Sequence, residues 1–286
     1  MSSVIHNGVL IDAAGAVFPL TESDLIHGYG CYETLKVRGG VLYYPEFHAE
    51  RLIRSADIIG FSHNLTIHTV VDAMERLVCA EHTADCNIKI MVFGHTTREA
   101  DWYVLCLPAL YPPEGARTGG VACMAFHGER QFPQAKSLSL LLSTVAFRQA
   151  EARGCWDALL VNRRGEITEG TRTNVFFALQ EEPHQVYTPP ACDVLAGITR
   201  KTCMEAMEHA GRPVLERTLS LSEILSGKAG LMVSSTSSRL LPVTSLYTGP
   251  ADREGRSVAV MDVLLQCASV YEEALQQYAM GRPRLV

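Results

Sequence analysis

The sequence lacks a long apolar run and any excess of basic residues. Of its 286 residues, 47% are apolar and 20% are charged, which is typical of a globular protein, and no apolar stretch is long enough to span a bilayer. The formal net charge is −6, and the basic residues are scattered along the chain. These features argue against a membrane or a nucleic acid as the main partner.

Paired cysteine motifs are also missing. The nine cysteines include no C-x-x-C pair, so the sequence predicts neither a zinc cage nor a disulfide framework. The opening stretch MSSVIHNGVLIDAAG has no basic segment followed by an apolar one, which a signal peptide would have. We therefore expect a cytoplasmic protein.

Several common catalytic signatures are absent. Neither G-x-G-x-x-G nor G-x-x-x-x-G-K-[ST] occurs, which removes the usual dinucleotide and triphosphate cradles. H-E-x-x-H and G-x-S-x-G are missing too, so we expect no metal site and no serine hydrolase.

Strand-like and helix-like segments alternate without a strict βαβ rhythm. Residues 4–11 and 34–44 place glycine-centred turns between β-rich runs, as hairpins do. Patterns typical of helices cover residues 48–61, 67–82, 141–154, 198–211 and 261–280. Residues 108–120 are rich in proline and glycine. We predict an α+β fold with two domains, residues 1–112 and 121–286, joined by a linker at residues 113–120.

Two segments are suited to binding an anion. In LAGITRKT, Gly197 directly precedes a predicted helix, so the amides of Ile198 and Thr199 would face a phosphate at the positive end of the helix dipole. VSSTSSRL, residues 233–240, places five hydroxyls in a row after a strand. An ordinary helix start and a solvated serine-rich loop are the alternative interpretations.

Two charged positions stand beside apolar segments. Lys136 precedes the apolar run SLSLLL, and burial there would lower an amine's pKa, as a Schiff-base nucleophile requires. A surface lysine is the plain alternative. Glu169 and Arg172 lie in GEITEGTRTNVFF between two predicted strands, where Glu169 could simply cap a turn.

Taken together, these segments resemble the fold-type IV pyridoxal-phosphate enzymes. That family holds the D-amino-acid and branched-chain aminotransferases and aminodeoxychorismate lyase. The resemblance covers nearly the whole chain and rests on six motifs in the family's order: HGYGCYETLKVRGG, HAERLIRSA, AKSLSLLLSTVAFRQAEARGCWDALLVN, ITEGTRTNVFF, TPP with LAGITR, and SSTSSRLLPV.

The resemblance implies a role for each matching residue. Lys136 would hold pyridoxal 5'-phosphate as a Schiff base and shuttle the α-proton, and Glu169 would keep the pyridine nitrogen protonated. Arg51 would bind the phosphate, together with the amides of Ile198 and Thr199 and with Ser235 and Thr236. Family members usually form homodimers, so we expect one here.

Substrate residues follow the family less closely. Tyr32 matches a carboxylate-binding tyrosine, and His95 and Arg98 in FGHTTREAD differ in order and spacing from the arginine and histidine of the D-enzymes. We also expect the Arg172 guanidinium to bind a substrate carboxylate, with an outward-pointing salt bridge as the alternative.

Four functions stay open at this point. The leading one is a ping-pong aminotransferase that moves an amino group between an amino acid, with D-amino acids favoured, and a 2-oxo acid. The alternatives are a branched-chain L-amino acid aminotransferase, a 4-amino-4-deoxychorismate lyase, and a non-catalytic protein that binds pyridoxal phosphate.

Overall fold

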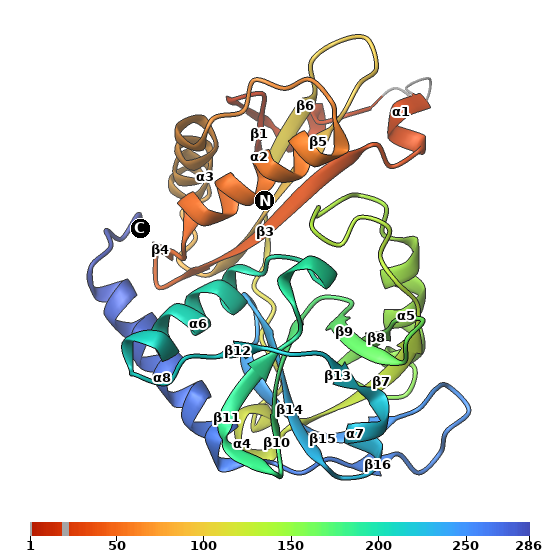
Figure 1. Ribbon diagram of the computed structural model, residues 1–286. Coiled ribbons are helices and arrows are strands. Elements are labelled where there is room, and N and C mark those ends of the chain that lie inside the picture. The colour runs from red at the N-terminus through yellow and green to blue at the C-terminus, as the bar shows by residue number, and fades with distance from the viewer. Residues whose placement is uncertain (1, 19–22) are drawn as a thin grey trace. The chain divides into compact units, whose positions relative to one another are not determined.

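The computed structural model describes residues 2–18 and 23–286. Their contacts divide the chain into two compact units (Figure 1). The first unit consists of Met1–Tyr111, Ala135–Ser139 and Tyr278–Val286, and the second consists of Pro112–Gln134 and Leu140–Gln277.

The two units differ from the predicted domains at two segments. Residues 135–139 pack with the first unit because they pair with one of its strands through Cys31 and Ser137. The C-terminal segment does so because Leu285 N–H donates to Gly40 O at 2.9 Å. The predicted linker at residues 113–120 contains a short helix, α4 (Ala116–Gly119), in which Ala116 is buried.

The first unit is built on an antiparallel sheet of order β2-β1-β6-β5-β3-β4. Its strands are β1 (Ser3–His6), β2 (Val9–Asp12), β3 (Gly30–Arg38), β4 (Val41–Leu42), β5 (Cys86–Phe93) and β6 (Asp101–Pro108). Both predicted hairpins are present. Asn7-Gly8 and Gly39-Gly40 form their turns with positive φ, the conformation that two-residue hairpin loops need.

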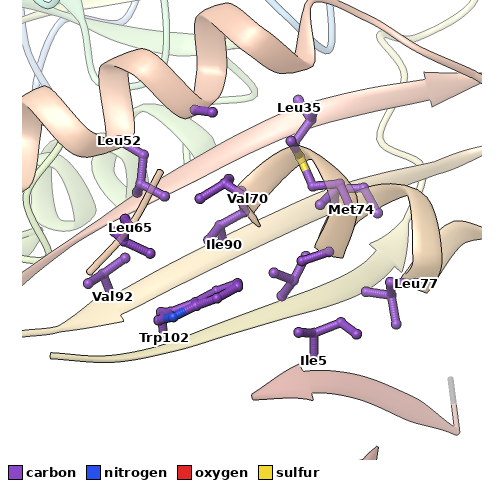
Figure 2. Packing of buried hydrophobic residues seen from close by; sticks show 14 of the residues in the cluster. Ile5, Leu35, Leu52, Leu65, Val70, Met74, Leu77, Ile90, Val92 and Trp102 are labelled. Carbon is purple, nitrogen blue, oxygen red and sulfur yellow. The ribbon is translucent and has the colours of Figure 1, made fainter. Parts of the chain in front are cut away.

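Two amphipathic helices supply the core of the first unit. These are α2 (Pro45–Ile59) and α3 (Ile67–Glu81), and short helical turns lie at η1 (Ala13–Gly15) and α1 (Ser23–Ile26). Figure 2 shows Leu52 of α2 and Met74 of α3 packed with strand residues such as Trp102. Because both helices contribute to one apolar cluster with the strands, they cover the same face of the sheet. Helix α2 begins earlier than the predicted residue 48, since Pro45 occupies its first turn, where a missing N–H costs nothing.

The second unit contains a larger mixed sheet of order β12-β11-β10-β14-β15-β7-β8-β9-β13, with β16 paired to β15. Its strands are β7 (Val121–His127), β8 (Asp157–Val161), β9 (Glu166–Gly170), β10 (Asn174–Leu179), β11 (Glu182–Thr188), β12 (Leu215–Glu216), β13 (Leu219–Ser220), β14 (Ala229–Ser235), β15 (Arg239–Tyr247) and β16 (Arg256–Ser257). Every residue of β10 is buried, which explains its unbroken sequence NVFFAL.

The helices of the second unit agree broadly with the sequence patterns. They are α5 (Leu141–Glu151), η2 (Ala191–Asp193), α6 (Ile198–His209), α7 (Leu221–Leu225) and α8 (Asp262–Met280). The predicted α+β class is therefore confirmed. Within residues 2–18 and 23–286, every helix is too short or too polar to cross a membrane.

Candidate active site

The predicted site residues divide between the two units. The first unit holds Tyr32, Arg51, His95, Arg98 and Lys136, and the second holds Glu169, Arg172, Ile198, Thr199, Ser235 and Thr236.

The backbone around Lys136 is fixed against strand β3. Tyr32 N–H donates to Lys136 O at 2.9 Å, and Leu138 N–H donates to Gly30 O at 2.9 Å. A Cβ on Gly30 would lie 2.2 Å from Val92 O and 2.9 Å from a Leu138 methyl, so only glycine allows this approach. Lys136 Nζ lies 4.4 Å from the centre of the Tyr32 ring. The structure thus brings the predicted lysine and the predicted tyrosine together.

Ser55 connects Lys136 to helix α2. Its hydroxyl donates to Arg51 O at 2.7 Å and accepts a hydrogen bond from Lys136 N–H at 3.1 Å. The serine of the HAERLIRS motif therefore joins the turn that carries Arg51 to the segment that carries Lys136. The sequence contained this residue in a recognised motif but gave no indication of its contact.

The Arg51 guanidinium is bound by a buried carboxylate, Glu33. Arg51 Nε donates to Glu33 Oε1 at 2.6 Å and Nη2 donates to Oε2 at 2.8 Å, while His48 Nδ1 lies 2.8 Å from Oε2. Burial alone would raise the pKa of Glu33, but Arg51 and His48 lower it well below its usual range. Burial also lowers the pKa of His48. Glu33 was not among the predicted site residues. The signal for it is a carboxylate within the apolar strand CYETLKV, with His48 and Arg51 three residues apart on one helix face.

His95 and Arg98 meet at one carboxylate. His95 Nε2 lies 3.0 Å from Asp101 Oδ2, and Arg98 Nη1 donates to the same oxygen at 2.7 Å. Desolvation opposes ionisation of Asp101, yet hydrogen bonds from Asn7, Arg98 and His95 lower its pKa to about 2. The structure brings the predicted pair together with Asp101 as its carboxylate partner.

In the second unit, Glu169 is held from two sides. Its side chain is 5% exposed, with Oε1 accepting from Arg130 Nη1 at 3.1 Å and Oε2 accepting from Leu195 N–H at 3.1 Å. Arg130 also donates to Pro133 O at 3.0 Å. Two charge-assisted hydrogen bonds favour the ionised carboxylate. Arg130 was not predicted, and its only sequence signal is its position six residues before Lys136.

The two predicted anion-binding segments adjoin Glu169 within the second unit. Asn174, the first residue of β10, donates from Nδ2 to Leu195 O at 3.0 Å and pairs with Ser234 of β14. Gly197 is the N-cap of α6, and a Cβ there would lie 1.8 Å from Asn174 Oδ1. Since Leu195 also donates to Glu169, the chain runs from the carboxylate directly to the first turn of α6.

The predicted phosphate-binding residues lie at the ends of these elements. Ile198 and Thr199 begin α6, and their N–H groups belong to the unsatisfied first turn of a helix. Ser235 ends β14, and its hydroxyl lies 2.7 Å from the Ser238 hydroxyl. Thr236 follows in the turn that leads to β15. Glu169 and both predicted anion sites are therefore neighbours within one unit.

Arg172 has a different set of neighbours from Glu169. Its guanidinium carbon lies 3.8 Å from the centre of the Phe147 ring, Nη2 donates to Trp156 O at 2.5 Å, and Nε lies 4.0 Å from Asp157 Oδ1. The side chain is 38% exposed. These contacts are those of a partly exposed structural arginine, and a role in substrate binding stays a prediction.

Residues 30–246, most of the chain, match the sequence pattern of the family described as amino-transferase class IV. The chain belongs to this family. Among the described residues of this class IV aminotransferase, no group of three or more His, Cys, Asp or Glu side chains is placed to hold a metal ion.

Relatives of this class IV aminotransferase carry two kinds of name. The D-alanine aminotransferase of Bacillus licheniformis is 26% identical over 253 residues, which cover 85% of this chain and 88% of that protein. A putative branched-chain-amino-acid aminotransferase of Methanocaldococcus jannaschii is 26% identical over 249 residues, which cover 83% of this chain and 85% of that protein. The similarity therefore shows an aminotransferase without resolving its substrate.

A solved structure supports the fold. The branched-chain aminotransferase of the thermophilic archaeon Thermoproteus uzoniensis, crystallised with norvaline, superposes with a TM-score of 0.85 over 99% of this chain and 99% of that chain. At 22% identity, this likeness establishes the fold alone.

Proposed function

We propose that this class IV aminotransferase uses pyridoxal 5'-phosphate to move an amino group between an amino acid, with D-amino acids favoured, and a 2-oxo acid. The observation that carries the proposal is the arrangement in the second unit, where buried Glu169 adjoins the first turn of α6 and the end of β14. A carboxylate suits a protonated ring nitrogen, and helix N–H groups suit a phosphate. The donor set therefore fits this cofactor.

Each site residue would have a distinct task. Glu169, fixed by Arg130 and Leu195, would hold a proton on the ring nitrogen. The first-turn amides of α6, at Ile198 and Thr199, would bind the phosphate, together with Ser235, Thr236 and Arg51. When bound, the cofactor supplies an electron-accepting ring that stabilises negative charge at the substrate's α-carbon. Lys136 would carry the cofactor and then move the α-proton.

The preference for D-amino acids rests on sequence and on named relatives. The segments KSLSLL and GCWDALL resemble the D-amino-acid enzymes, and the relatives include D-alanine aminotransferases. The branched-chain L-amino acid activity is the second candidate, because a relative with that name is also 26% identical. Stereochemistry depends on how the substrate carboxylate is bound, so a direct assay is needed.

A half-reaction screen tests the proposal. The purified protein, loaded with pyridoxal phosphate, is mixed with single D- and L-amino acids, and the absorbance of the lysine-bound cofactor is followed. We expect D-alanine or D-glutamate to react at least about tenfold faster than its L-enantiomer. Faster reaction with L-leucine or L-valine would assign the branched-chain activity. A cofactor that no amino acid converts to the amine form would exclude a transaminase and leave the lyase and the non-catalytic binding protein.

A further inference from the structure

Asp157, the first residue of β8, is a fully buried carboxylate with no role in the proposed chemistry. A buried charge is costly unless hydrogen bonds compensate it, so its partners indicate its purpose. Oδ1 accepts from the Thr171 hydroxyl and from Ala158 N–H at 2.9 Å. Oδ2 accepts from the Thr173 hydroxyl at 2.8 Å and from Arg172 N–H at 3.2 Å. Three of the four donors therefore come from residues 171–173.

These three residues form the turn between β9 and β10. Glu169 and Gly170 end β9, and Asn174 begins β10. The carboxylate is so close to the turn that a Cβ on Gly170 would lie 2.5 Å from Asp157 Oδ2 and 2.1 Å from the Thr173 hydroxyl. The turn is thus packed around the carboxylate, and glycine is required beside it.

Glu169 and Asn174, which flank the turn, both form hydrogen bonds with the backbone of Leu195. Glu169 Oε2 accepts from Leu195 N–H at 3.1 Å, and Asn174 Nδ2 donates to Leu195 O at 3.0 Å. Leu195 stands three residues before the first residue of α6. Any displacement of the turn would move both of these contacts together.

Arg172 completes this arrangement. Its main chain donates to Asp157, and its guanidinium, fixed by Trp156 O and the Phe147 ring, lies near the same carboxylate. Burial raises the pKa of Asp157, and the nearby Arg172 charge and these hydrogen bonds act against that rise.

We propose that Asp157 is a positioning residue that fixes the turn of residues 171–173, and through it sets Glu169 and Asn174 against Leu195 at the start of α6. This inference deepens the proposed function and rests on it, because the groups that Asp157 positions are those assigned to the ring nitrogen and the phosphate. Asp157 itself would touch neither cofactor nor substrate.

The test compares Asp157→Asn with a matched control, Asp252→Asn. Asp252 also organises a turn of the second unit, accepting from Thr248 N–H and the Thr248 hydroxyl at 2.9 and 3.0 Å and from Glu254 and Gly255 N–H at 3.2 Å. Asp157→Asn should fold, because Thr171 N–H still donates to Ala158 O and Gly170 N–H to Thr173 O. The smaller change Thr173→Val removes one hydroxyl donor, and Thr248→Val is its control.

The first readout uses the cofactor-free protein, so it does not depend on the proposed function. Hydrogen–deuterium exchange of the Leu195 amide reports whether Glu169 still accepts its N–H. We expect Asp157→Asn to speed this exchange at least about tenfold, Thr173→Val to speed it less, and both controls to stay within about twofold of wild type. Unchanged Leu195 exchange in Asp157→Asn, with faster exchange confined to residues 171–173, would overturn the proposal.

The second readout uses the loaded enzyme. We expect Asp157→Asn to lower kcat at least about tenfold, to leave the KM for the amino donor within about threefold, and to shift the absorbance of the bound cofactor. If Asp157 only stabilised the fold, Asp157→Asn would lower the melting temperature but leave kcat and the cofactor spectrum of the folded enzyme as in wild type. That result would contradict the proposal. A wild-type protein that binds no pyridoxal phosphate would refute the proposed function but not the effect on Leu195.

Discussion

At the residue scale, buried carboxylates organise both units, each with a different kind of partner. Glu33 is bound by Arg51 and His48, Glu169 by Arg130 and a backbone N–H, and Asp157 by hydroxyls and backbone N–H groups. The hydrogen-bond donors of a buried carboxylate determine what it holds in place. A carboxylate fully paired with an arginine fixes the position of that arginine. One held by threonine hydroxyls and backbone N–H groups fixes a turn.

The Glu33–Arg51 pair gives a stability prediction. Glu33→Gln leaves the Arg51 charge buried without its anion, so we expect it to lower the free energy of unfolding by about 3 kcal/mol. The matched control is Glu46→Gln, whose carboxylate pairs with Arg282 at the surface at 2.7 Å. Glu46→Gln should lower the free energy of unfolding by less than about 1 kcal/mol. Urea unfolding of both variants measures the difference, and equal losses would show that Arg51 does not depend on Glu33.

Lys136 gives a chemical prediction. Borohydride reduction of the loaded protein should fix the cofactor on the peptide that contains Lys136, because that amine is the proposed attachment point. Mass spectrometry of the digest locates the adduct, and Lys136→Ala is the control, which should retain none. An adduct on another lysine, or none in the wild type, would refute the assignment of Lys136.

Two measurements on Arg172→Ala, unfolding stability and the KM for glutamate, distinguish a structural role of Arg172 from a role in substrate binding. Its contacts with Asp157, Trp156 and Phe147 lead us to expect that Arg172→Ala lowers the free energy of unfolding by about 1–2 kcal/mol. The role predicted from the sequence would instead raise the KM for glutamate at least about tenfold. Steady-state kinetics on the folded variant decide this, since a tenfold rise in KM with unchanged stability would place Arg172 in the substrate site.

At the element scale, the start of α6 depends on a close approach that only glycine permits. Gly197 stands against the Asn174 side chain, and Arg200 of the same first turn binds Thr188, Pro189 and Glu216. Arg200 thus connects the TPP and LAGITR segments directly. Asn174 of β10 binds Leu195 just before the helix, and Arg200 ties the first turn to Thr188 of β11, Pro189 and Glu216 of β12.

Gly197→Ala tests that close approach. The new Cβ would lie 1.8 Å from Asn174 Oδ1, so either the loop or the Asn174 amide, which binds Leu195 O, must move, and we expect a loss of about 2–3 kcal/mol in the free energy of unfolding. Weaker binding of pyridoxal phosphate should accompany it. Gly249→Ala is the control, because nothing lies within 4 Å of a Cβ at that position. Fluorescence titration with the cofactor compares the affinities of the two variants. Equal affinities would show that the start of α6 does not bind the phosphate.

At the scale of the whole molecule, the chain enters the first unit three times. Residues 135–139 join it although residues on both sides belong to the second unit, and residues 278–286 return to it. The backbone of Lys136 is thus bound to strand β3 and helix α2, which are distant from it in the sequence.

The assembly of the protein gives a further prediction. We propose a homodimer, in keeping with the family resemblance. Sedimentation equilibrium at micromolar concentration should therefore give twice the chain mass of 31.4 kDa. A mass equal to one chain at that concentration would exclude the dimer.

Much of the local structure could be predicted from the sequence. The Asn7-Gly8 and Gly39-Gly40 turns and helix α3 follow from glycine preference and apolar spacing, which act over a few residues. The start of α2 was misplaced because the pattern from residue 48 onward omits Pro45. Family membership was also readable, since six motifs stand in order and residues 30–246 match the family.

By itself, then, the sequence determined the α+β class, the family and the identity of Lys136 and Glu169 as candidates. Only the tertiary structure decided which charges meet. Arg51 is bound by Glu33, which lies 18 residues away in the sequence. The turn beside Glu169 is hydrogen-bonded to Asp157, which lies 16 residues from Thr173. Spacing along a chain fixes which face a residue occupies, but strand order and register decide which donor reaches a buried carboxylate.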